Sequence, residues 1–145
     1  MKIGIASDHR GYKLKEQIKE KLTDIKVVDY GTDSDEICDY PDYAFKLGEA
    51  VASKKVDFGV AICGSGIGIG IACNKVKGIR CATVRTLEDV KMTRNDNNAN
   101  VIAISEKTDL EKALKMIDTM VNTPFAGIDR YVRRINKIRD YEETK

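Results

Sequence analysis

Hydrophobic residues along the chain follow two alternating patterns. Short apolar runs are typical of buried strands, whereas apolar residues that recur every three or four positions indicate helices with one buried face. The runs predict strands at residues 2–7, 26–30, 58–63, 79–84 and 101–105. The periodic segments predict helices at residues 12–22, 43–53, 69–75, 87–93, 110–121 and 131–141.

This alternation of strands and helices predicts an α/β fold. Each connection between strands is long enough for one helix, which favours βαβ units and a five-stranded, mostly parallel sheet with helices on both faces. Proline is scarce and no linker or repeat interrupts the chain, so we expect one domain over residues 1–145. Ligands of such sheets bind beyond the carboxyl ends of the strands. We therefore expect the chemistry at residues 7–11, 30–41, 63–70, 84–86 and 94–100.

The composition describes a surface of mixed charge. The 145 residues include 25 Lys and Arg against 23 Asp and Glu, a net charge of +2, unlike the basic footprint of a nucleic-acid or anionic-membrane binder. No apolar run reaches the roughly 18 residues of a membrane span, and the amino-terminal segment becomes polar too soon for a signal peptide. A single histidine excludes a His-rich metal site. We expect a cytoplasmic protein without metal, nucleic-acid or membrane partners.

The cysteines form no C-x-x-C pair, so the sequence has neither a zinc knuckle nor a thioredoxin-like redox motif. Because the chain is long enough to build its own core and lacks a secretion signal, we expect all of them to be reduced. Cys73 and Cys81 lie in apolar segments, where a free cysteine is usually a small buried hydrophobe. Cys63 differs, because a glycine-rich segment follows it directly.

That segment reads Gly-Ser-Gly-Ile-Gly, and we call residues 64–68 the glycine turn. Successive N–H groups of such a turn can bind an anion, and the positive end of the following helix dipole favours negative charge. The same field favours the thiolate form of Cys63, which makes this residue a candidate base or nucleophile. The alternative is a turn that only lets the strand and the helix pack closely.

Three familiar glycine motifs do not fit this segment. The dinucleotide fingerprint G-x-G-x-x-G would need Gly where Ile69 or Ile71 stands, and the P-loop would need a G-K-[ST] ending. The nucleophile elbow G-x-S-x-G would need Gly in place of Cys63. Flavodoxin-like nucleotide binding is therefore disfavoured.

Polar residues also follow the first two predicted strands. Asp8 is suited either to cap the next helix or to bind a ligand, and His9 can titrate near neutrality or donate to a phosphate. Asp39, Tyr40 and Pro41 follow the second strand, where the proline alone would explain a turn.

Two further polar clusters lie in the second half of the chain. Residues 95–100 read Asn-Asp-Asn-Asn-Ala-Asn, which fits a polar turn but also amide groups that bind sugar hydroxyls. Arg130 and Arg134 are four positions apart on the last predicted helix, so they share a face and can clamp one phosphate. A solvated basic helix face is the alternative, and no interleaved aromatic residues favour nucleic acid.

Together, these motifs resemble the ribose-5-phosphate isomerase B / galactose-6-phosphate isomerase family, from Met1 to about Ile138. The matching motifs are Ser7-Asp8-His9, Asp39-Tyr40-Pro41, Ile62-Cys63-Gly64-Ser65-Gly66-Ile67-Gly68, Ala72-Cys73-Asn74-Lys75, Asn97-Asn98-Ala99-Asn100 and the pair Arg130 and Arg134. The resemblance implies a flavodoxin-like α/β/α sandwich and a homodimer, or dimer of dimers, whose active sites are shared between subunits. It also implies interconversion of an aldose phosphate and a ketose phosphate with no cofactor.

The resemblance further implies a role for each residue. Cys63 would be the base that moves a proton between C2 and C1, and Ser65 occupies a family position that carries a hydroxyl. The amides that hold the enediolate oxygen would be those of Gly64, Ser65, Gly66, Ile67 and Gly68. Such preorganised donors are worth about 3–4 kcal/mol each.

Substrate contacts follow from the same resemblance. Asp8 and Tyr40 would bind sugar hydroxyls or the ring oxygen, and Asn97 would reach the sugar across the dimer interface. The phosphate ligands would be His9, Arg130 and Arg134.

Two positions depart from the family pattern. Asp96 stands where members that act on ribose 5-phosphate usually carry the His that opens the sugar ring, and a carboxylate is a suitable base but a poor general acid. Lys107 stands where the family tends to carry Arg. We expect a ribose-5-phosphate isomerase. The alternatives are an isomerase of a six-carbon sugar phosphate, such as allose or galactose 6-phosphate, and a non-catalytic sugar-phosphate-binding subunit.

Overall fold

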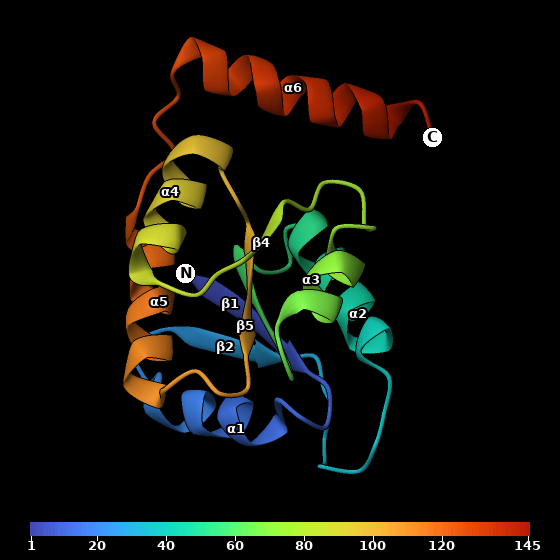
Figure 1. Cartoon of the computed structure of the whole chain (residues 1–145), viewed down its shortest axis with the longest axis vertical. Helices are drawn as coiled ribbons and strands as arrows, with labels where there is room; N and C mark the ends of the chain where they lie inside the picture. The colour runs from blue at the N-terminus through green and yellow to red at the C-terminus, as the bar shows by residue number, and fades with distance from the viewer.

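A five-stranded, fully parallel sheet forms the centre of the computed structural model, which describes residues 1–145. Its strands are β1 (Lys2–Ser7), β2 (Lys26–Asp29), β3 (Phe58–Cys63), β4 (Cys81–Thr83) and β5 (Val101–Ser105), in the spatial order β2-β1-β3-β5-β4. Helices cover both faces of this sheet, as Figure 1 shows. The predicted three-layer α/β/α class is therefore confirmed.

The helices divide between the two faces. One face is covered by α1 (Tyr12–Lys21), α4 (Leu87–Asn97) and α5 (Leu110–Asn122). The other is covered by α2 (Tyr40–Ala52) and α3 (Ile67–Cys73). A sixth helix, α6 (Asp129–Glu143), follows α5. No helix is long and apolar enough to cross a membrane.

The central strands present different residues to the two layers, because successive side chains of a strand point to opposite faces. Larger side chains such as Ile5 and Ile62 pack against α1, α4 and α5. Small residues such as Ala61 and Gly4 face α2 and α3. A methyl group at Gly4 would lie 2.8 Å from Leu47 of α2, so the missing side chain lets this helix approach closely.

The chain changes direction across the sheet between β1 and β3. β2 lies beyond β1 at one edge, and the chain then returns to place β3 on the other side of β1. Ser7 pairs with Ile62, so Asp8 and Cys63 leave neighbouring strands at the same end. This is the position where open α/β sheets bind ligands.

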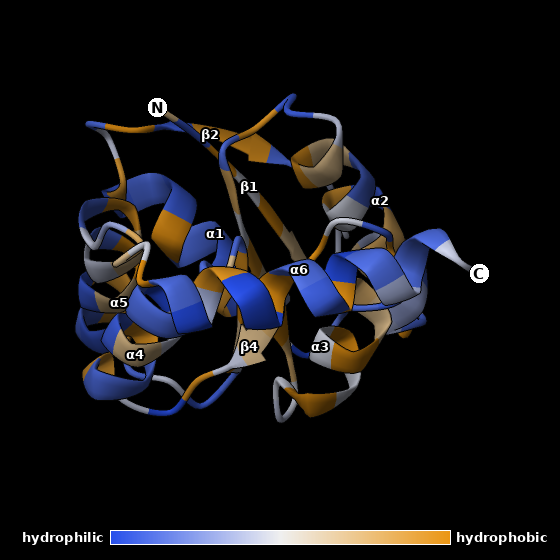
Figure 2. Cartoon of the chain, turned by 90° about the horizontal axis from the view of Figure 1, so that it is seen from above, coloured by the Kyte–Doolittle hydropathy of each residue, from blue (hydrophilic) through white to orange (hydrophobic).

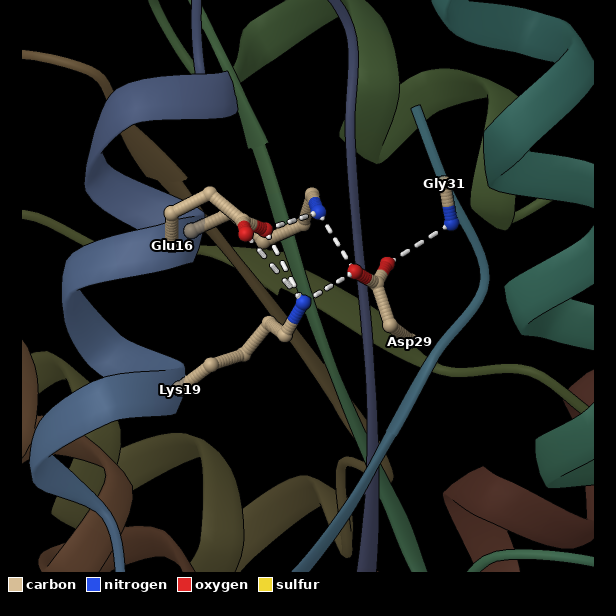
Figure 3. A network of polar contacts seen from close by, with 5 residues as sticks. Glu16, Lys19, Asp29 and Gly31 are labelled. Atoms are coloured by element: carbon tan, nitrogen blue, oxygen red, sulfur yellow. Dashed lines mark hydrogen bonds and ion pairs between the residues drawn. The ribbon is translucent and has the colours of Figure 1, made fainter. Parts of the chain in front are cut away.

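A charge network around the buried Lys15 ammonium supports the loop that leaves β2 (Figure 3). The Lys15 ammonium is fully buried and donates to Asp29 at 2.7 Å and to Glu16 at 2.8 Å, while Lys19 also donates to Asp29 at 2.7 Å. The second Asp29 oxygen accepts the Gly31 N–H at 2.8 Å. Burial would raise the pKa of Asp29, but the hydrogen bonds from both lysines outweigh it and lower the pKa.

The backbone beyond this network reaches β1 directly. Ser7 N–H donates to the Gly31 carbonyl at 2.7 Å, and Thr32 N–H donates to the Ser7 carbonyl at 2.9 Å. The charge network therefore fixes the loop that runs beside Asp8.

The sixth helix crosses the opposite end of the sheet. Figures 1 and 2 show α6 running past the amino-terminal ends of the strands, from the side of α4 and α5 toward the side of α3. None of its residues is buried, and Glu142 accepts the Gly78 N–H at 3.2 Å, just before β4. Exposed apolar side chains on or next to it include Ile128, Val132, Ile138 and Tyr141.

One sequence expectation about placement is wrong. Residues 94–100 precede β5, so they lie at the amino end of the sheet and not at the carboxyl end, where we expected the chemistry. Arg94–Asn97 also continue α4, which we had expected to end at Thr93. Asn98 ends this helix in the left-handed conformation, with φ 48°, which asparagine tolerates better than most residues.

Other element bounds differ by a few residues. The helix α2 begins at Tyr40 instead of Tyr43, because Pro41 in the first turn has the backbone angle that a helix start requires. The edge strand β4 contains only Cys81–Thr83 of the predicted 79–84.

Candidate active site

Cys63 ends β3 and its side chain is turned into the glycine turn. The thiol is buried, and its sulfur accepts the Gly66 N–H at 3.2 Å. A donor in this position stabilises negative charge on sulfur. Gly66 has φ 78°, and a methyl group there would lie 2.8 Å from the Ile104 backbone, so only glycine fits.

The N–H groups of the glycine turn have different partners. Ile67 N–H donates to the Ser65 hydroxyl at 3.1 Å. Those of Gly64, Ser65 and Gly68 make no hydrogen bond within the chain. Three free donors next to the Cys63 sulfur are suited to a developing negative charge.

Asp8 and His9 lie beside this turn. The Asp8 N–H donates to the Ile62 carbonyl at 3.3 Å, which joins the two strand ends. One Asp8 carboxylate oxygen accepts the N–H groups of Arg10 at 2.9 Å and Gly11 at 3.1 Å. Asp8 thus holds the turn before α1 and does not cap the helix, whose cap is Gly11.

The ring of His9 is oriented by the loop that follows β2. Its Nδ1 accepts the Cys38 N–H at 3.3 Å. In the neutral ring the other nitrogen, Nε2, therefore carries the hydrogen and acts as a donor.

An ion pair also stands next to the glycine turn. Arg10 Nε lies 2.6 Å from Glu106 Oε2, and this carboxylate oxygen would be 3.5 Å from a methyl group at Gly64. Glu106 N–H donates to the Cys63 carbonyl at 2.8 Å, so the segment after β5 is tied to the end of β3.

Tyr40 reaches the same turn from α2. A methyl group at Gly68 would lie 2.7 Å from the Tyr40 ring, so the absence of a side chain makes room for the tyrosine. The structure therefore brings Asp8, Tyr40, Cys63 and residues 64–68 together, as the sequence predicts.

The remaining predicted site residues lie at the other end of the molecule. Asp96 and Asn97 are in the last turn of α4, and Arg130 and Arg134 are exposed on α6. Arg130 donates to the Tyr131 hydroxyl at 3.3 Å, and Asp96 accepts from the Asn95 side chain at 2.8 Å. Within one chain these residues do not meet Cys63.

A half-buried arginine, Arg80, and a buried one, Arg94, hold the end of α4 that carries Asn97. Arg80 donates to the carbonyls of Asn97 at 2.9 Å and Asn98 at 3.0 Å, and Arg94 donates to the Asn98 side chain at 2.8 Å. Burial lowers the pKa of both guanidinium groups. This end of α4 is therefore well fixed although Asn97 itself is exposed.

None of the main hollows of the single chain is lined by residues of the glycine turn. The hollow of about 730 Å³ lies between α6 and the segment after α3, and one of about 370 Å³ is lined by Asp96 and its neighbours. Neither includes Cys63. Cys63 with its glycine turn and these hollows are thus at different places in one chain.

All four cysteines are free thiols. The Cys73 and Cys81 thiols lie together between α3 and β4, and the hydrogen bond to Cys73, together with burial, raises the pKa of Cys81 well above its usual value. Cys73 is a buried packing residue, as the sequence suggested, and the half-buried Cys81 packs beside it.

The structure adds residues that the sequence analysis did not assign. Thr83, Arg85 and Ser105 each donate to a carbonyl of the glycine turn. The only sequence signal was their position at or after strand ends, at the same edge of the sheet as Cys63. A side chain that donates to a backbone carbonyl has no sequence motif by which it could be recognised.

Comparison with known proteins gives consistent matches over nearly the whole chain. A profile described as Ribose/Galactose Isomerase matches residues 3–138. The ribose-5-phosphate isomerase B of Escherichia coli is 36% identical, over 99% of this chain and 98% of that protein.

Solved structures are similar as well. A ribose-5-phosphate isomerase B from Clostridium thermocellum is 44% identical, with a TM-score of 0.94 over 99% of both chains. The Mycoplasma genitalium ribose-5-phosphate isomerase B, solved with bound ribulose 5-phosphate, is 38% identical, with a TM-score of 0.91 over 99% of this chain and 97% of that one.

Proposed function

The chain belongs to the ribose/galactose isomerase family of aldose–ketose isomerases, and on this premise we propose that it interconverts ribose 5-phosphate and ribulose 5-phosphate with Cys63 as the base. The observation that carries the mechanism is the Cys63 sulfur beside a turn of free N–H donors. The similarity to a relative solved with ribulose 5-phosphate supports the substrate. Residues 1–145 would form one catalytic domain.

The reaction needs only proton transfers. The Cys63 thiolate removes the C2 proton of the open-chain aldose, and the electron pair moves to the aldehyde oxygen, which gives an enediolate. The free N–H groups of the glycine turn stabilise that oxygen. The Ser65 hydroxyl moves a proton between O2 and O1, and the Cys63 thiol returns its proton to C1. No redox cofactor takes part, because no electron leaves the sugar.

We further propose that a second copy of the chain completes each site. The phosphate ligands Arg130 and Arg134 and the sugar ligand Asn97 lie at the opposite end from Cys63 in one chain. The helix α6 buries none of its residues and exposes apolar side chains, which favours contact with another subunit. A homodimer would place the α6 of one copy over the glycine turn of the other.

Within each copy, Asp8 and Tyr40 would bind sugar hydroxyls and His9 would donate to the phosphate. The Nε2 hydrogen of His9, which the Cys38 contact leaves free, suits that role. Asp96, which lies beside Asn97 at the end of α4, would come from the other copy and act as the base in ring opening. This residue limits that step, because a carboxylate donates protons poorly at neutral pH.

Replacement of Cys63 tests the proposal. We expect Cys63→Ala to lower kcat for ribose 5-phosphate by about 10³-fold, since it removes the base while the fold remains. A coupled assay of ribulose 5-phosphate formation measures this loss. Cys81→Ala is the matched control, because it removes a packing thiol, and it should keep most of the activity.

The substrate is tested on the same protein. Ribose, allose and galactose phosphates are compared by kcat/KM, and we expect the ribose compound to be highest. Turnover of a six-carbon compound without turnover of ribose 5-phosphate would contradict the substrate. Binding of sugar phosphates without any turnover would indicate a non-catalytic subunit.

A further inference from the structure

Three consecutive carbonyl groups of the glycine turn are held by side chains from other segments. Ser105 Oγ donates to the Gly64 carbonyl at 2.7 Å, and Thr83 Oγ1 donates to the Gly66 carbonyl at 3.1 Å. Arg85 Nη1 donates to the carbonyl between them, that of Ser65, at 2.8 Å. We call Thr83, Arg85 and Ser105 the clamp residues.

The peptide plane links each clamp contact to the group on its far side. In a planar trans peptide the C=O of one residue and the N–H of the next point in opposite directions. A donor that holds the carbonyl therefore fixes the direction of the following N–H. Ser105 and Arg85 thus fix the N–H groups of Ser65 and Gly66. Thr83 fixes that of Ile67 together with the Gly70 N–H, which also donates to the Gly66 carbonyl at 3.2 Å.

Each of these N–H groups has a different task in the proposed reaction. The Ser65 N–H is free and is a donor for the enediolate oxygen. The Gly66 N–H binds the Cys63 sulfur at 3.2 Å, and the Ile67 N–H binds the Ser65 hydroxyl oxygen at 3.1 Å. Ser105 therefore fixes the amide that binds the enediolate oxygen. Arg85 fixes the amide that binds the Cys63 sulfur, and Thr83 fixes the amide that binds the Ser65 hydroxyl.

The clamp residues are themselves held in place. Ser105 Oγ accepts the Lys107 N–H at 3.1 Å, so its own hydrogen is left for the Gly64 carbonyl. Arg85 N–H donates to Asp89 at 2.9 Å, and Asp89 belongs to the capping box that starts α4. The backbone of Arg85 is thus anchored although its side chain reaches out.

We propose that Thr83, Arg85 and Ser105 are positioning residues for the isomerisation, each aiming one N–H of the glycine turn. This inference rests on the proposed function, since the aimed groups matter only if Cys63 and the turn carry out the reaction. The role of each clamp residue is carried by its bond to a backbone carbonyl and needs no contact with the substrate. They preorganise the donors, which lowers the barrier without adding ground-state affinity.

Two substitutions remove one hydroxyl each and keep the shape of the side chain nearly unchanged. We expect Thr83→Val and Ser105→Ala to lower kcat about tenfold, less than the roughly 10²–10³-fold loss of a direct oxyanion donor. KM for ribose 5-phosphate should stay within about twofold, because the donors act mainly on the charged intermediate. Thr83→Ser and Ser105→Thr keep the hydroxyl and should restore kcat.

A binding measurement separates positioning from a merely structural role. A phosphorylated hydroxamate carries the planar, charged group of an enediolate, and its Kd should rise about as much as kcat falls in Thr83→Val and Ser105→Ala. Loss of a structural contact alone would lower the melting temperature without this parallel. Ser53→Ala is the matched control, since it removes a hydroxyl-to-carbonyl bond of 3.3 Å to Ala50 at the end of α2.

The role of Arg85 is tested by the reactivity of the Cys63 sulfur, because Arg85 fixes the Gly66 N–H that binds this sulfur. Arg85→Gln should slow alkylation of Cys63 by iodoacetamide severalfold, measured by mass spectrometry in about 0.5 M salt, where long-range charge attraction is screened. Thr83→Val should leave the alkylation rate unchanged, because Thr83 fixes the N–H that binds the Ser65 hydroxyl and not the one that binds the sulfur.

The outcomes are distinguishable. Unchanged kcat and hydroxamate affinity in both Thr83→Val and Ser105→Ala, in a chain whose activity depends on Cys63, would overturn the positioning role alone. A chain inactive on every sugar phosphate, or one indifferent to loss of Cys63, would instead contradict the proposed function.

Discussion

At the scale of single residues, hydrogen bonds from backbone N–H groups orient the side chains of the site. His9 has its tautomer set by the Cys38 N–H, and Asp8 uses one oxygen to hold two N–H groups of its own turn. Asp96 differs, because the only hydrogen bond of its side chain is accepted from the neighbouring Asn95 side chain. A residue with so few contacts can be replaced without disturbing the fold.

Asp96→His is therefore a clean test of ring opening. We expect kcat/KM for ribose 5-phosphate to rise about tenfold, because an imidazole both accepts and donates protons near neutral pH, whereas a carboxylate only accepts them. Asp96→Asn, which has neither function, should lower it. Steady-state kinetics at pH 7 measure both variants, and equal rates in all three proteins would refute a role in ring opening.

At the scale of elements, α1 is joined to the end of β2 by the charge network of Figure 3. Lys15 has no exposed side-chain surface, so its ammonium depends on Asp29 and Glu16 for compensation. The hydrogen bond from Lys15 also lowers the pKa of Glu16. The network is thus a structural element that brings the loop after β2 to the site.

We expect Asp29→Asn to destabilise the protein by about 3 kcal/mol at pH 7, because it leaves the buried Lys15 with a single, half-exposed partner. The pKa of Asp29 is lowered in the folded state, so its contribution is complete above the ordinary value of 3.8. It is lost as the pH falls below 3.8 through the lower folded-state pKa. The free energies of unfolding of the variant and of the original protein should therefore become similar in acid.

Urea unfolding at pH 7 and pH 3 measures this difference. Asp24→Asn, at an exposed carboxylate between α1 and β2, is the matched control and should change little. If the difference in free energy of unfolding between Asp29→Asn and the original protein stays constant with pH, the stabilising role of the ionised Asp29 is contradicted.

At the scale of the whole molecule, the two halves of the proposed site are at opposite ends of the sheet. Cys63 and the glycine turn follow β3, while α6 crosses the amino ends of the strands (Figure 1). A chain of this shape cannot fold its own arginines onto its own cysteine. The proposed homodimer follows from this geometry.

Mixing two inactive variants tests the shared site. Cys63→Ala and Arg134→Ala each disable a different half, so a dimer with one copy of each would contain one complete site and one doubly defective site. Random reassociation should restore about a quarter of the original activity. Each variant alone remains inactive, and no recovery after unfolding and refolding together would contradict a site shared between copies.

The sequence predicts the fold well because the central strands are buried on both faces. β1, β3 and β5 have the predicted bounds, since their apolar runs are continuous, whereas the edge strand β4 is shorter than predicted. The neighbours of Cys63 at the carboxyl ends of β1 and β3 also follow from a parallel sheet. Contacts such as Ser105 to Gly64, 41 residues apart, depend on tertiary packing and have no local signal.

The clamp also ties the glycine turn to the edge of the sheet. Thr83 belongs to the three-residue edge strand β4, which pairs only with β5, and Arg85 follows it closely. Short edge elements open locally at a lower free-energy cost than the centre of a domain. Such an opening would release the Ser65 carbonyl, while the Gly66 carbonyl would keep its bond from the Gly70 N–H at 3.2 Å and Cys63 would stay at the end of a central strand. We therefore expect the part of the turn that Arg85 holds to loosen with the sheet edge, on the timescale of local unfolding and not of side-chain motion.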